Sequence, residues 1–469
     1  MTTEAPSFHH TDTGTSEATW LGSDRWDGVG VLDLDAVLRR FTEVLVVAAH
    51  PDDETLGVGG LLADLSDAGA SLHVLVATDG ERSHPVADDA ARAALAARRR
   101  DEVEGALRLL APGARVTHLG LPDTRLDRAG TGLRDAVAQA CGPQTLVIAP
   151  WVADGHADHD ALGRAAAAAA ASSGAAAAHY PIWLWHWSTP DDLPWQLLVA
   201  VEPSREALQR KRSALEEFRT QTTPRGGPEA GDATGAGAAV LGGPVLERAH
   251  RLLEVLLDPA GVLPVLSEAA RSDRPLGRTA TLDAMYDRGD DPWQLEGSFY
   301  EDRRRALVLG VLGHRQLGRV LEVGCADGRL TAELLRRADA VVALDTSPRA
   351  VRAARTRAPS AEVHEGTAPH DLPAGPFDLV VLSEVGYFLT PLELLATLRR
   401  CAAALAPGGE LLLCHWQHPT TDVPLDGRLV HDQAASQLGL HRRASYADED
   451  LRIEVWGDGP SLALREGRG

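Results

Sequence analysis

The chain has 469 residues, enough for two or three domains, and its hydrophobic content of 44% is typical of globular proteins. Its formal net charge of −21 argues against a protein that binds nucleic acid through a basic face. The first residues lack the charged and apolar regions of a secretory signal, and no stretch resembles a membrane span. We therefore expect a cytoplasmic protein that acts on a small molecule, without nucleic-acid or membrane partners.

The first half of the chain alternates between apolar runs and helical patterns. Residues 1–27 are polar and are expected to form a disordered or loosely packed arm. The alternation that follows is typical of βαβ units and a mostly parallel sheet, with an alanine-rich helix after residue 160. The predicted strands are 44–49, 72–78, 116–119, 145–150, 181–187 and 196–201, and the other predicted helices are 55–68, 89–110, 132–140, 204–218 and 244–257.

A second alternating pattern follows a segment that contains several prolines and glycines. It predicts helices at 301–312, 330–336, 348–357 and 391–405, and strands at 319–323, 340–344, 361–365, 377–382 and 410–415. The predicted fold class is α/β, with two Rossmann-like domains, each a mostly parallel sheet flanked by helices. We expect the first domain at 28–260 with a flexible insertion at 225–243, a linker at 261–279, and the second domain at 280–469.

Two clusters of polar side chains follow predicted strands of the first domain. His50, Asp52 and Asp53 come after strand 44–49, and a cluster at 156–159 comes after strand 145–150. The carboxyl ends of parallel strands meet at one sheet edge, where open α/β sheets bind ligands. Imidazole and carboxylate are zinc ligands, so one of the two adjacent acids would bind a metal and the other would reach a water. The alternative is that these residues only cap the following helix.

Five short motifs stand in a fixed order over about residues 40 to 257. They are Ala-His-Pro-Asp-Asp-Glu at 49–54, Thr-Asp-Gly-Glu at 78–81, Arg-Arg-Asp-Glu at 99–102, Leu-Gly-Leu-Pro-Asp at 119–123 and Gly-His-Ala-Asp-His at 155–159. Their combination resembles the PIG-L/LmbE family of metal-dependent N-deacetylases, which act on N-acetylglucosaminyl conjugates.

This resemblance implies a role for each polar residue of the two clusters. It implies that His50, Asp53 and His159 bind Zn²⁺ or another divalent metal, and that Asp52 is the general base. It further implies that His156 stabilises or protonates the intermediate and is oriented by Asp158. Some family members carry an oxyanion-binding tyrosine just before the Gly-His pair. Asp154 stands in that place here, so this donor is absent or comes from another loop.

Other polar and aromatic residues of the first half allow two interpretations. Of the two adjacent arginines, either Arg99 faces a sugar or phosphate, or Arg99 and Arg100 both line a solvated helix face. Trp183, Trp185 and Trp187 alternate with other residues in a predicted strand. They either pack in the core and at the sheet edge, or one of them stacks on a sugar ring.

A strand, a glycine turn and the start of a helix follow one another from residue 320 to 330. Glycines there let backbone N–H groups approach a ligand closely, and Asp345 ends the next strand, where an acid can bind ribose hydroxyls. This order resembles class I S-adenosylmethionine-dependent methyltransferases, although Ala326 replaces the middle glycine. The resemblance implies that Glu322, Gly324 and Gly328 belong to the cofactor site, the two glycines beside its methionine part, and that Asp345 holds the ribose.

Several motifs between residues 282 and 432, among them Ser-Glu-Val-Gly-Tyr-Phe-Leu at 383–389 and His-Trp-Gln-His-Pro at 415–419, resemble NodS-type N-methyltransferases. Those enzymes methylate the free amine of a deacetylated chito-oligosaccharide. An amine must lose its proton before methyl transfer, and Glu384, Tyr387 and His415 are candidates to accept or orient it. The alternatives are cofactor binding for Glu384, packing for Tyr387 and a strand-end hydrogen bond for His415. We choose Glu384 as the catalytic residue.

Together these patterns predict a bifunctional enzyme. It would remove the acetyl group of an N-acetylated sugar conjugate with the help of zinc, and then methylate the freed amine with S-adenosylmethionine. A second hypothesis joins the same deacetylase to a methyltransferase that acts on an oxygen or carbon of an unrelated substrate. A third is a scaffold with one inactive site, although all the expected ligands are present.

Overall fold

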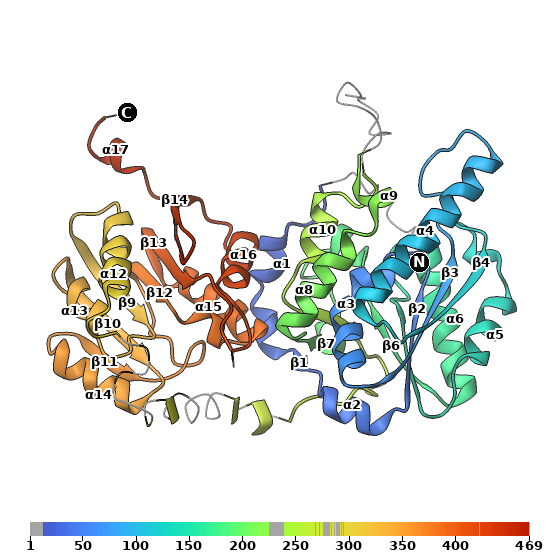
Figure 1. The fold of residues 1–469 in the computed structure, drawn as a ribbon, viewed down its shortest axis with the longest axis horizontal. Coiled ribbons are helices and arrows are strands. Elements are labelled where there is room, and N and C mark those ends of the chain that lie inside the picture. The colour runs from blue at the N-terminus through green and yellow to red at the C-terminus, as the bar shows by residue number, and fades with distance from the viewer. Residues whose placement is uncertain are drawn as a thin grey trace. The chain divides into compact units, whose positions relative to one another are not determined.

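A computed structural model of the chain describes residues 13–224, 239–267 and 295–468 except Asp422, together with 269–271, 273–274, 282, 284–285, 287, 291 and 293. The chain divides into two compact units, Met1–Leu266 and Ser267–Gly469. Each unit is a mostly parallel sheet flanked by helices (Figure 1), so the predicted α/β fold class is confirmed. The insertion expected at 225–243 lies largely outside the described residues, and residues 268, 272 and 275–279 of the expected linker at 261–279 also lie outside them.

The sheet of the first unit contains the strands β1 (Gly30–Val31), β2 (Glu43–Ala48), β3 (Ser71–Thr78), β4 (Arg115–Leu121), β5 (Thr145–Pro150), β6 (Ala176–Tyr180), β7 (Leu198–Val201) and β8 (Glu254–Leu257). Their order is β1-β7-β8-β6-β5-β2-β3-β4. β8 runs antiparallel to β6 and β7, and the other neighbouring strands are parallel.

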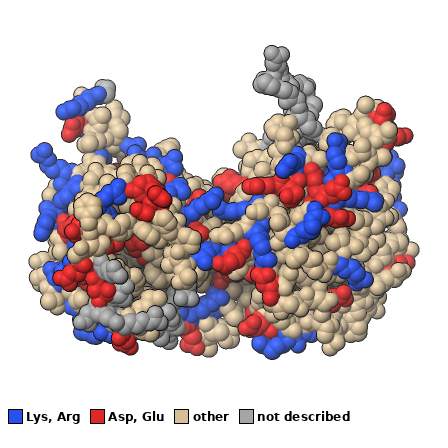
Figure 2. Space-filling model, viewed as in Figure 1, with Lys and Arg blue, Asp and Glu red and all other residues tan. Residues whose placement is uncertain are grey.

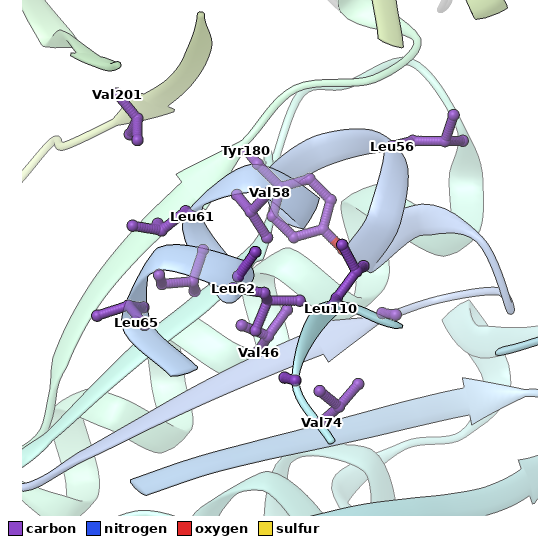
Figure 3. Close-up of a cluster of buried hydrophobic side chains, with 14 of the residues drawn as sticks. Val46, Leu56, Val58, Leu61, Leu62, Leu65, Val74, Leu110, Tyr180 and Val201 are labelled. Carbon is purple, nitrogen blue, oxygen red and sulfur yellow. The ribbon is translucent and has the colours of Figure 1, made fainter. Parts of the chain in front are cut away.

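The helices of this unit are α1 (Glu17–Leu21), α2 (Leu34–Arg40), α3 (Asp53–Asp67), α4 (Asp89–Leu110), α5 (Thr131–Gln139), α6 (Ala157–Ser173), α7 (Leu184–Trp187), α8 (Arg205–Leu215), α9 (Arg219–Thr222) and α10 (Gly243–Ala249). Alternate residues of β2 face opposite helical layers, as strand geometry requires. Val44 and Val46 belong to the core with α3, α4 and α8, whereas Leu45 and Val47 belong to the core with α5 and α6. Figure 3 shows part of the first core, where leucines of α3 lie near Val46 and Val74.

The expectation of a disordered or loosely packed arm at 1–27 does not hold for the residues that the structure describes, which begin at 13. Residues 13–28, which we call the arm, contain α1 and a 3₁₀ turn, Asp24–Gly28. Trp20 and Trp26 of the arm are 0% and 2% exposed. Two indole rings bury a large apolar area, and this offsets the cost of ordering a polar segment.

Two predicted elements have a different structure. Residues 181–188, which we call the tryptophan segment, contain the short helix α7 in place of a strand. The predicted helix 244–257 is α10 followed by β8, which completes the sheet between β6 and β7. Short apolar runs fit a buried strand as well as a buried helix, so only their pairing partners decide between the two.

The second unit contains the strands β9 (Leu317–Val323), β10 (Ala338–Asp345), β11 (Glu362–Glu365), β12 (Phe377–Ser383), β13 (Leu405–Trp416), β14 (Arg442–Ala447) and β15 (Leu451–Trp456) in the order β11-β10-β9-β12-β13-β15-β14. β14 and β15 are antiparallel to each other, β15 is antiparallel to β13, and the remaining pairs are parallel. The helices are α12 (Phe299–Val311), α13 (Arg329–Leu334), α14 (Pro348–Arg357), α15 (Pro391–Ala403), α16 (Gly427–Gln437) and α17 (Leu462–Arg465).

Our predictions assigned no element after residue 415, where α16, β14 and β15 lie. Leu451, Ile453 and Val455 are buried, so the alternation typical of a strand is present in the sequence there. In the described part of the chain, no helix combines the length and apolar character needed to cross a membrane. Acidic and basic side chains lie next to one another on the face in Figure 2.

Candidate active sites

The polar clusters of the first unit meet at the carboxyl ends of its parallel strands. His50, Asp52 and Asp53 follow β2, Asp123 follows β4, and the loop after β5 leads into α6. Asp52 has a φ of 137°, which a residue with a side chain adopts only under strain. Such strain is concentrated at functional sites, where the surrounding structure maintains it.

His159 is fully buried, and its two ring nitrogens face different carboxylates. Nδ1 lies 2.7 Å from Asp154 Oδ2, and Nε2 lies 3.3 Å from Asp53 Oδ1. Among the described residues Nε2 has no hydrogen-bond partner. Burial lowers the pKa of His159, but the carboxylates of Asp53 and Asp154 outweigh it and raise the pKa to about 9. When Nδ1 donates to Asp154, the lone pair of the neutral imidazole lies on Nε2 and points at the Asp53 carboxylate. This contact therefore requires a cation, either a proton or a metal ion.

His50 repeats this arrangement on the other side of Asp53. Its Nδ1 lies 3.5 Å from Asp53 Oδ2, and its Nε2 lies 3.3 Å from both Asp123 Oδ1 and Asp158 Oδ2. Burial lowers the pKa of His50, but these three carboxylates outweigh it and hold the pKa well above the usual value. In metal-binding histidines, the ring nitrogen that does not bind the metal is usually held by a carboxylate or another acceptor in this way.

These contacts fit a divalent metal ion. His50, His156 and His159 have ligand atoms within 4.8 Å of one another, and the same holds for His50, Asp123 and Asp158. The predicted ligands His50 and His159 belong to the first group, and Asp53 lies between them. Imidazole and carboxylate suit zinc and several other divalent ions.

Asp158 and His156 are linked less directly than expected. The carboxylate of Asp158 accepts hydrogen bonds from Thr124 N and Leu126 N and lies beside His50, whereas only its backbone N–H donates to His156 Nδ1, at 3.3 Å. Burial, followed by the neighbouring His159, lowers the pKa of His156 to about 3, which favours the neutral imidazole.

Asp52 is held by an arginine that neither interpretation of the sequence placed there. Arg99 is 2% exposed, and its Nη2 donates to Asp52 Oδ2 at 2.9 Å and to Pro51 O at 2.7 Å. Burial raises the pKa of Asp52 to about 7, although the charge of Arg99 opposes the rise. A Cβ atom at Gly80, whose φ is 61°, would lie 1.6 Å from Arg99 Nη1, so a side chain there would displace the guanidinium that holds Asp52.

Asp154 has a role that the sequence analysis did not predict. It is fully buried, and besides His159 it contacts three backbone N–H groups at residues 182–184. The only signal in the sequence is an acid close to the two histidines, because its backbone partners lie about thirty residues away. Trp183 of the same segment lies beside His156, with ring centroids 6.5 Å apart.

In the second unit, a cavity of about 640 Å³ lies at the carboxyl ends of β9, β10, β12 and β13. Of the residues expected at the cofactor site, Glu322, Gly324 and Asp345 line this cavity, and so does Glu384. Gly328 is not among the lining residues and forms the N-terminal cap of α13. The volume is in the range of small-molecule and cofactor sites.

The glycine turn after β9 has three residues in the left-handed region. Gly324, Ala326 and Gly328 have φ values of 77°, 46° and 80°. A Cβ atom at Gly324 would lie 2.0 Å from Val385, and one at Gly328 would lie 2.7 Å from a backbone atom. Ala326 adopts this region without glycine's freedom, and its N–H donates to Asp345 Oδ2 at 2.8 Å.

Two acids at or near the glycine turn accept hydrogen bonds from the elements around it. Glu322 accepts a hydrogen bond from Thr331 Oγ1 at 2.6 Å, and burial raises its pKa to about 8. Asp345 accepts from Ser347 N as well as from the glycine turn. Both acids therefore shape the cavity wall in addition to lining it.

Glu384, directly after β12, is a second acid in a strained conformation, with a φ of 60°. Its Oε1 accepts from Trp416 N at 3.0 Å, and its Oε2 accepts from Tyr387 Oη at 2.6 Å. Burial raises the pKa of Glu384, although the nearby Arg304 charge opposes the rise. The Tyr387 hydroxyl thus orients Glu384, which lines the cavity together with Glu322 and Asp345.

Both ring nitrogens of His415 have hydrogen-bond partners inside the protein. Nε2 accepts from Gly386 N at 3.1 Å, and Nδ1 lies 3.3 Å from His431 Nε2. His431 Nδ1 lies 2.9 Å from Glu454 Oε2. Burial, followed by the neighbouring His431, lowers the pKa of His415 well below its usual value. The geometry supports the strand-end hydrogen bond for His415 over a role as base.

Comparisons with known proteins match the two units separately. Residues 45–170 match the PIG-L family, described as GlcNAc-PI de-N-acetylase, and residues 320–409 match a methyltransferase domain family. A 1D-myo-inositol 2-acetamido-2-deoxy-alpha-D-glucopyranoside deacetylase from Rhodococcus opacus is 33% identical over 126 residues, which cover 26% of this chain and 39% of that protein.

The second unit has relatives among NodS proteins. Nodulation protein S from Rhizobium tropici is 33% identical over 129 residues, which cover 26% of this chain and 54% of that protein, so the chain matches about half of this relative. The crystal structure of N-methyltransferase NodS from Bradyrhizobium japonicum WM9 with S-adenosyl-L-homocysteine is 25% identical, covers 39% of this chain and 98% of that one, and has a TM-score of 0.35. The chain therefore joins a deacetylase domain of the PIG-L family to a methyltransferase domain, and both families are enzymes.

Proposed function

We propose that this protein is a bifunctional enzyme that deacetylates the amine of an N-acetylated sugar conjugate and then methylates the same nitrogen. The observation that carries the first step is the buried Asp53 carboxylate, which lies between His50 Nδ1 and His159 Nε2. These three residues would hold Zn²⁺ or another divalent ion, with His156 close enough to assist. An acetamido sugar as substrate agrees with the name of the Rhodococcus relative.

In the deacetylation, the chain's own groups move the protons. A divalent ion held in this site would act as a Lewis acid, which polarises a carbonyl and lowers the pKa of a bound water. Asp52, held in place by Arg99, takes a proton from the attacking water. His156, as a neutral imidazole, stabilises the oxyanion, and Asp52 passes the proton taken from water to the departing nitrogen. The C–N bond breaks, and acetate and the free amine are the products.

In the methylation, the second unit binds S-adenosylmethionine and the acceptor in one cavity. Glu322, Gly324 and Asp345 line the part expected for the cofactor, and Glu384 lines the same cavity. Glu384 accepts a proton from the acceptor amine, and the neutral nitrogen then takes the methyl group from sulfur. Tyr387 holds Glu384 in position for this step.

Chemistry links the two steps, since the amine released by the first is the nucleophile of the second. The comparisons support the two reaction types separately, because one relative is named a deacetylase of an acetamido sugar and residues 320–409 match a methyltransferase domain family. Joining both domains in one chain raises the effective concentration of the intermediate at the second site.

The test is mass spectrometry of an N-acetylglucosaminyl conjugate incubated with the full chain, zinc and S-adenosylmethionine. We expect loss of the acetyl group followed by gain of methyl groups on the same nitrogen. The Asp52→Asn variant should leave the N-acetyl substrate unchanged but still methylate the free amine, and Glu384→Gln should stop at the free amine. Accumulation of an amine that never gains a methyl group would contradict the coupling. Methylation at oxygen or carbon would favour a separate tailoring substrate.

A further inference from the structure

The arm is bound to the tryptophan segment by backbone-directed hydrogen bonds. Trp20 Nε1 donates to Trp185 O at 2.9 Å. Thr15 donates from N to His186 O at 3.1 Å and from Oγ1 to Ser188 O at 2.6 Å. The arm therefore holds three carbonyl groups of this one segment.

A buried ion pair also holds the arm in place. Glu17, which is 3% exposed, accepts hydrogen bonds from Arg251 at 2.7 and 2.8 Å. The guanidinium of Arg251 also lies over the Trp185 ring, 4.3 Å from its centroid. Arg248 donates to Thr15 O at 2.9 Å. Removal of one partner leaves the other charge buried, so attachment of the arm depends strongly on Glu17.

The tryptophan segment is bound on its other side by Asp154. Asp154 Oδ1 accepts from Ile182 N at 2.9 Å and from Leu184 N at 3.0 Å, and Oδ2 accepts from Trp183 N at 3.0 Å. Trp187 Nε1 donates to the Asp154 backbone carbonyl at 2.7 Å. Four hydrogen bonds thus join Asp154 to the segment that the arm holds.

We propose that the arm is a positioning element of the deacetylase site, which acts through the tryptophan segment and Asp154 on His159. The proposal rests on the proposed function, because it takes His159 to be a metal ligand. The Asp154 carboxylate selects the tautomer of His159 and directs Nε2 toward Asp53. When the segment loosens, the three N–H groups that orient this carboxylate move away, and the imidazole is held less firmly. Loss of such a carboxylate partner typically weakens metal binding by about 10–100-fold.

The test measures the zinc affinity of the full chain by competition with a chelator, and the visible absorption of the Co²⁺-substituted protein. Asp154→Asn should weaken zinc binding by about 10–100-fold, and Glu17→Gln should weaken it by about 3–10-fold. Trp20→Phe keeps an aromatic ring in place, removes one hydrogen bond and leaves the buried charges paired, so its effect should be smaller. Both arm variants should shift the Co²⁺ spectrum in the direction of Asp154→Asn. Arg25→Gln is the matched control, since it breaks an exposed arm ion pair with Asp191 outside the tryptophan segment.

The outcomes separate this inference from the proposed function. A wild-type chain that binds no zinc would overturn both. A wild-type chain that binds zinc, with affinity and Co²⁺ spectrum unchanged in Glu17→Gln and Trp20→Phe, would overturn the role of the arm alone. Variants that have a lower thermal transition temperature but unchanged zinc affinity and Co²⁺ spectrum would also overturn the role of the arm. If Glu17→Gln does not fold, Trp20→Phe decides the question. Binding of S-adenosylmethionine, which the second unit should retain, reports whether each variant chain is folded.

Discussion

Each unit buries a histidine whose Nδ1 contacts a carboxylate, His159 in the first unit and His431 in the second. The hydrogen-bond chains that begin at these two contacts end differently. In the first unit, Asp154 holds His159 Nδ1, and Nε2 faces the Asp53 carboxylate without a hydrogen bond. This chain ends on two electron-pair donors, so it is complete only with a cation between them.

In the second unit the corresponding chain is already complete. Glu454 contacts His431 Nδ1, His431 Nε2 faces His415 Nδ1, and His415 Nε2 accepts from the Gly386 backbone N–H. Every nitrogen in this chain has a partner, so no ligand is required. A buried histidine therefore indicates a metal site only when its chain of hydrogen bonds is left open inside the protein.

The incomplete chain gives the largest expected effect. His159→Ala removes one side of the pair that needs a cation, so bound zinc should be lost. Deacetylation should fall by more than about 100-fold, because loss of a ligand exceeds the usual effect of changing its partner. Elemental analysis and an acetate-release assay measure both, and methylation of a free-amine substrate is the internal control. Retention of one zinc per chain would contradict the assignment of His159.

The next effect concerns the acid at the second site. Glu384→Gln keeps the shape of the side chain but cannot accept a proton, so kcat for amine methylation should fall by about 100-fold. Calorimetry should find the affinity for S-adenosylmethionine within about twofold of wild type. If that affinity falls as far as kcat, Glu384 binds the cofactor and is not the base.

The complete chain is expected to matter for stability and not for metal binding. His431→Ala removes the middle member and leaves His415 Nδ1 without its partner, which should destabilise the second unit by about 2 kcal/mol. Urea unfolding followed by loss of S-adenosylmethionine binding measures this change. The zinc affinity of the first unit should stay the same, and a fall in zinc affinity would contradict the distinction between the two chains.

Backbone strain is the second feature that the two sites share, and it gives the smallest expected effect. Ala326, in the glycine turn, has a φ of 46°, and left-handed backbone costs a residue with a Cβ about 1–2 kcal/mol. Ala326→Gly relieves this strain but adds about 0.5–1 kcal/mol of backbone entropy cost, so a net gain of about 0.5 kcal/mol is expected. Ala332→Gly in α13 is the control and should destabilise by about 1 kcal/mol. A lower melting temperature for Ala326→Gly would show that the strain is not relieved.

Much of the fold follows from local patterns. The bounds of α4, α14 and β5 equal the predicted ranges, because long helical periods and short apolar runs between turns are visible in a single sequence. The meeting of His50 with His159 could also be predicted, since both follow parallel strands of one sheet. The arm could not, because a short polar segment with two tryptophans has no period that predicts a structure. The alternating tryptophans at 183–187 predicted a strand where the helix α7 lies.

By itself, the sequence of this protein determined two α/β domains and the strand ends at which their polar motifs gather. The tertiary structure alone decided which groups those motifs contact. Asp158 contacts His50 through its carboxylate, Asp154 holds His159, and Arg99 holds Asp52. Each of these contacts joins residues from different elements or turns of the chain. A carboxylate accepts from whichever donors the fold brings within about 3 Å, and sequence spacing does not specify them.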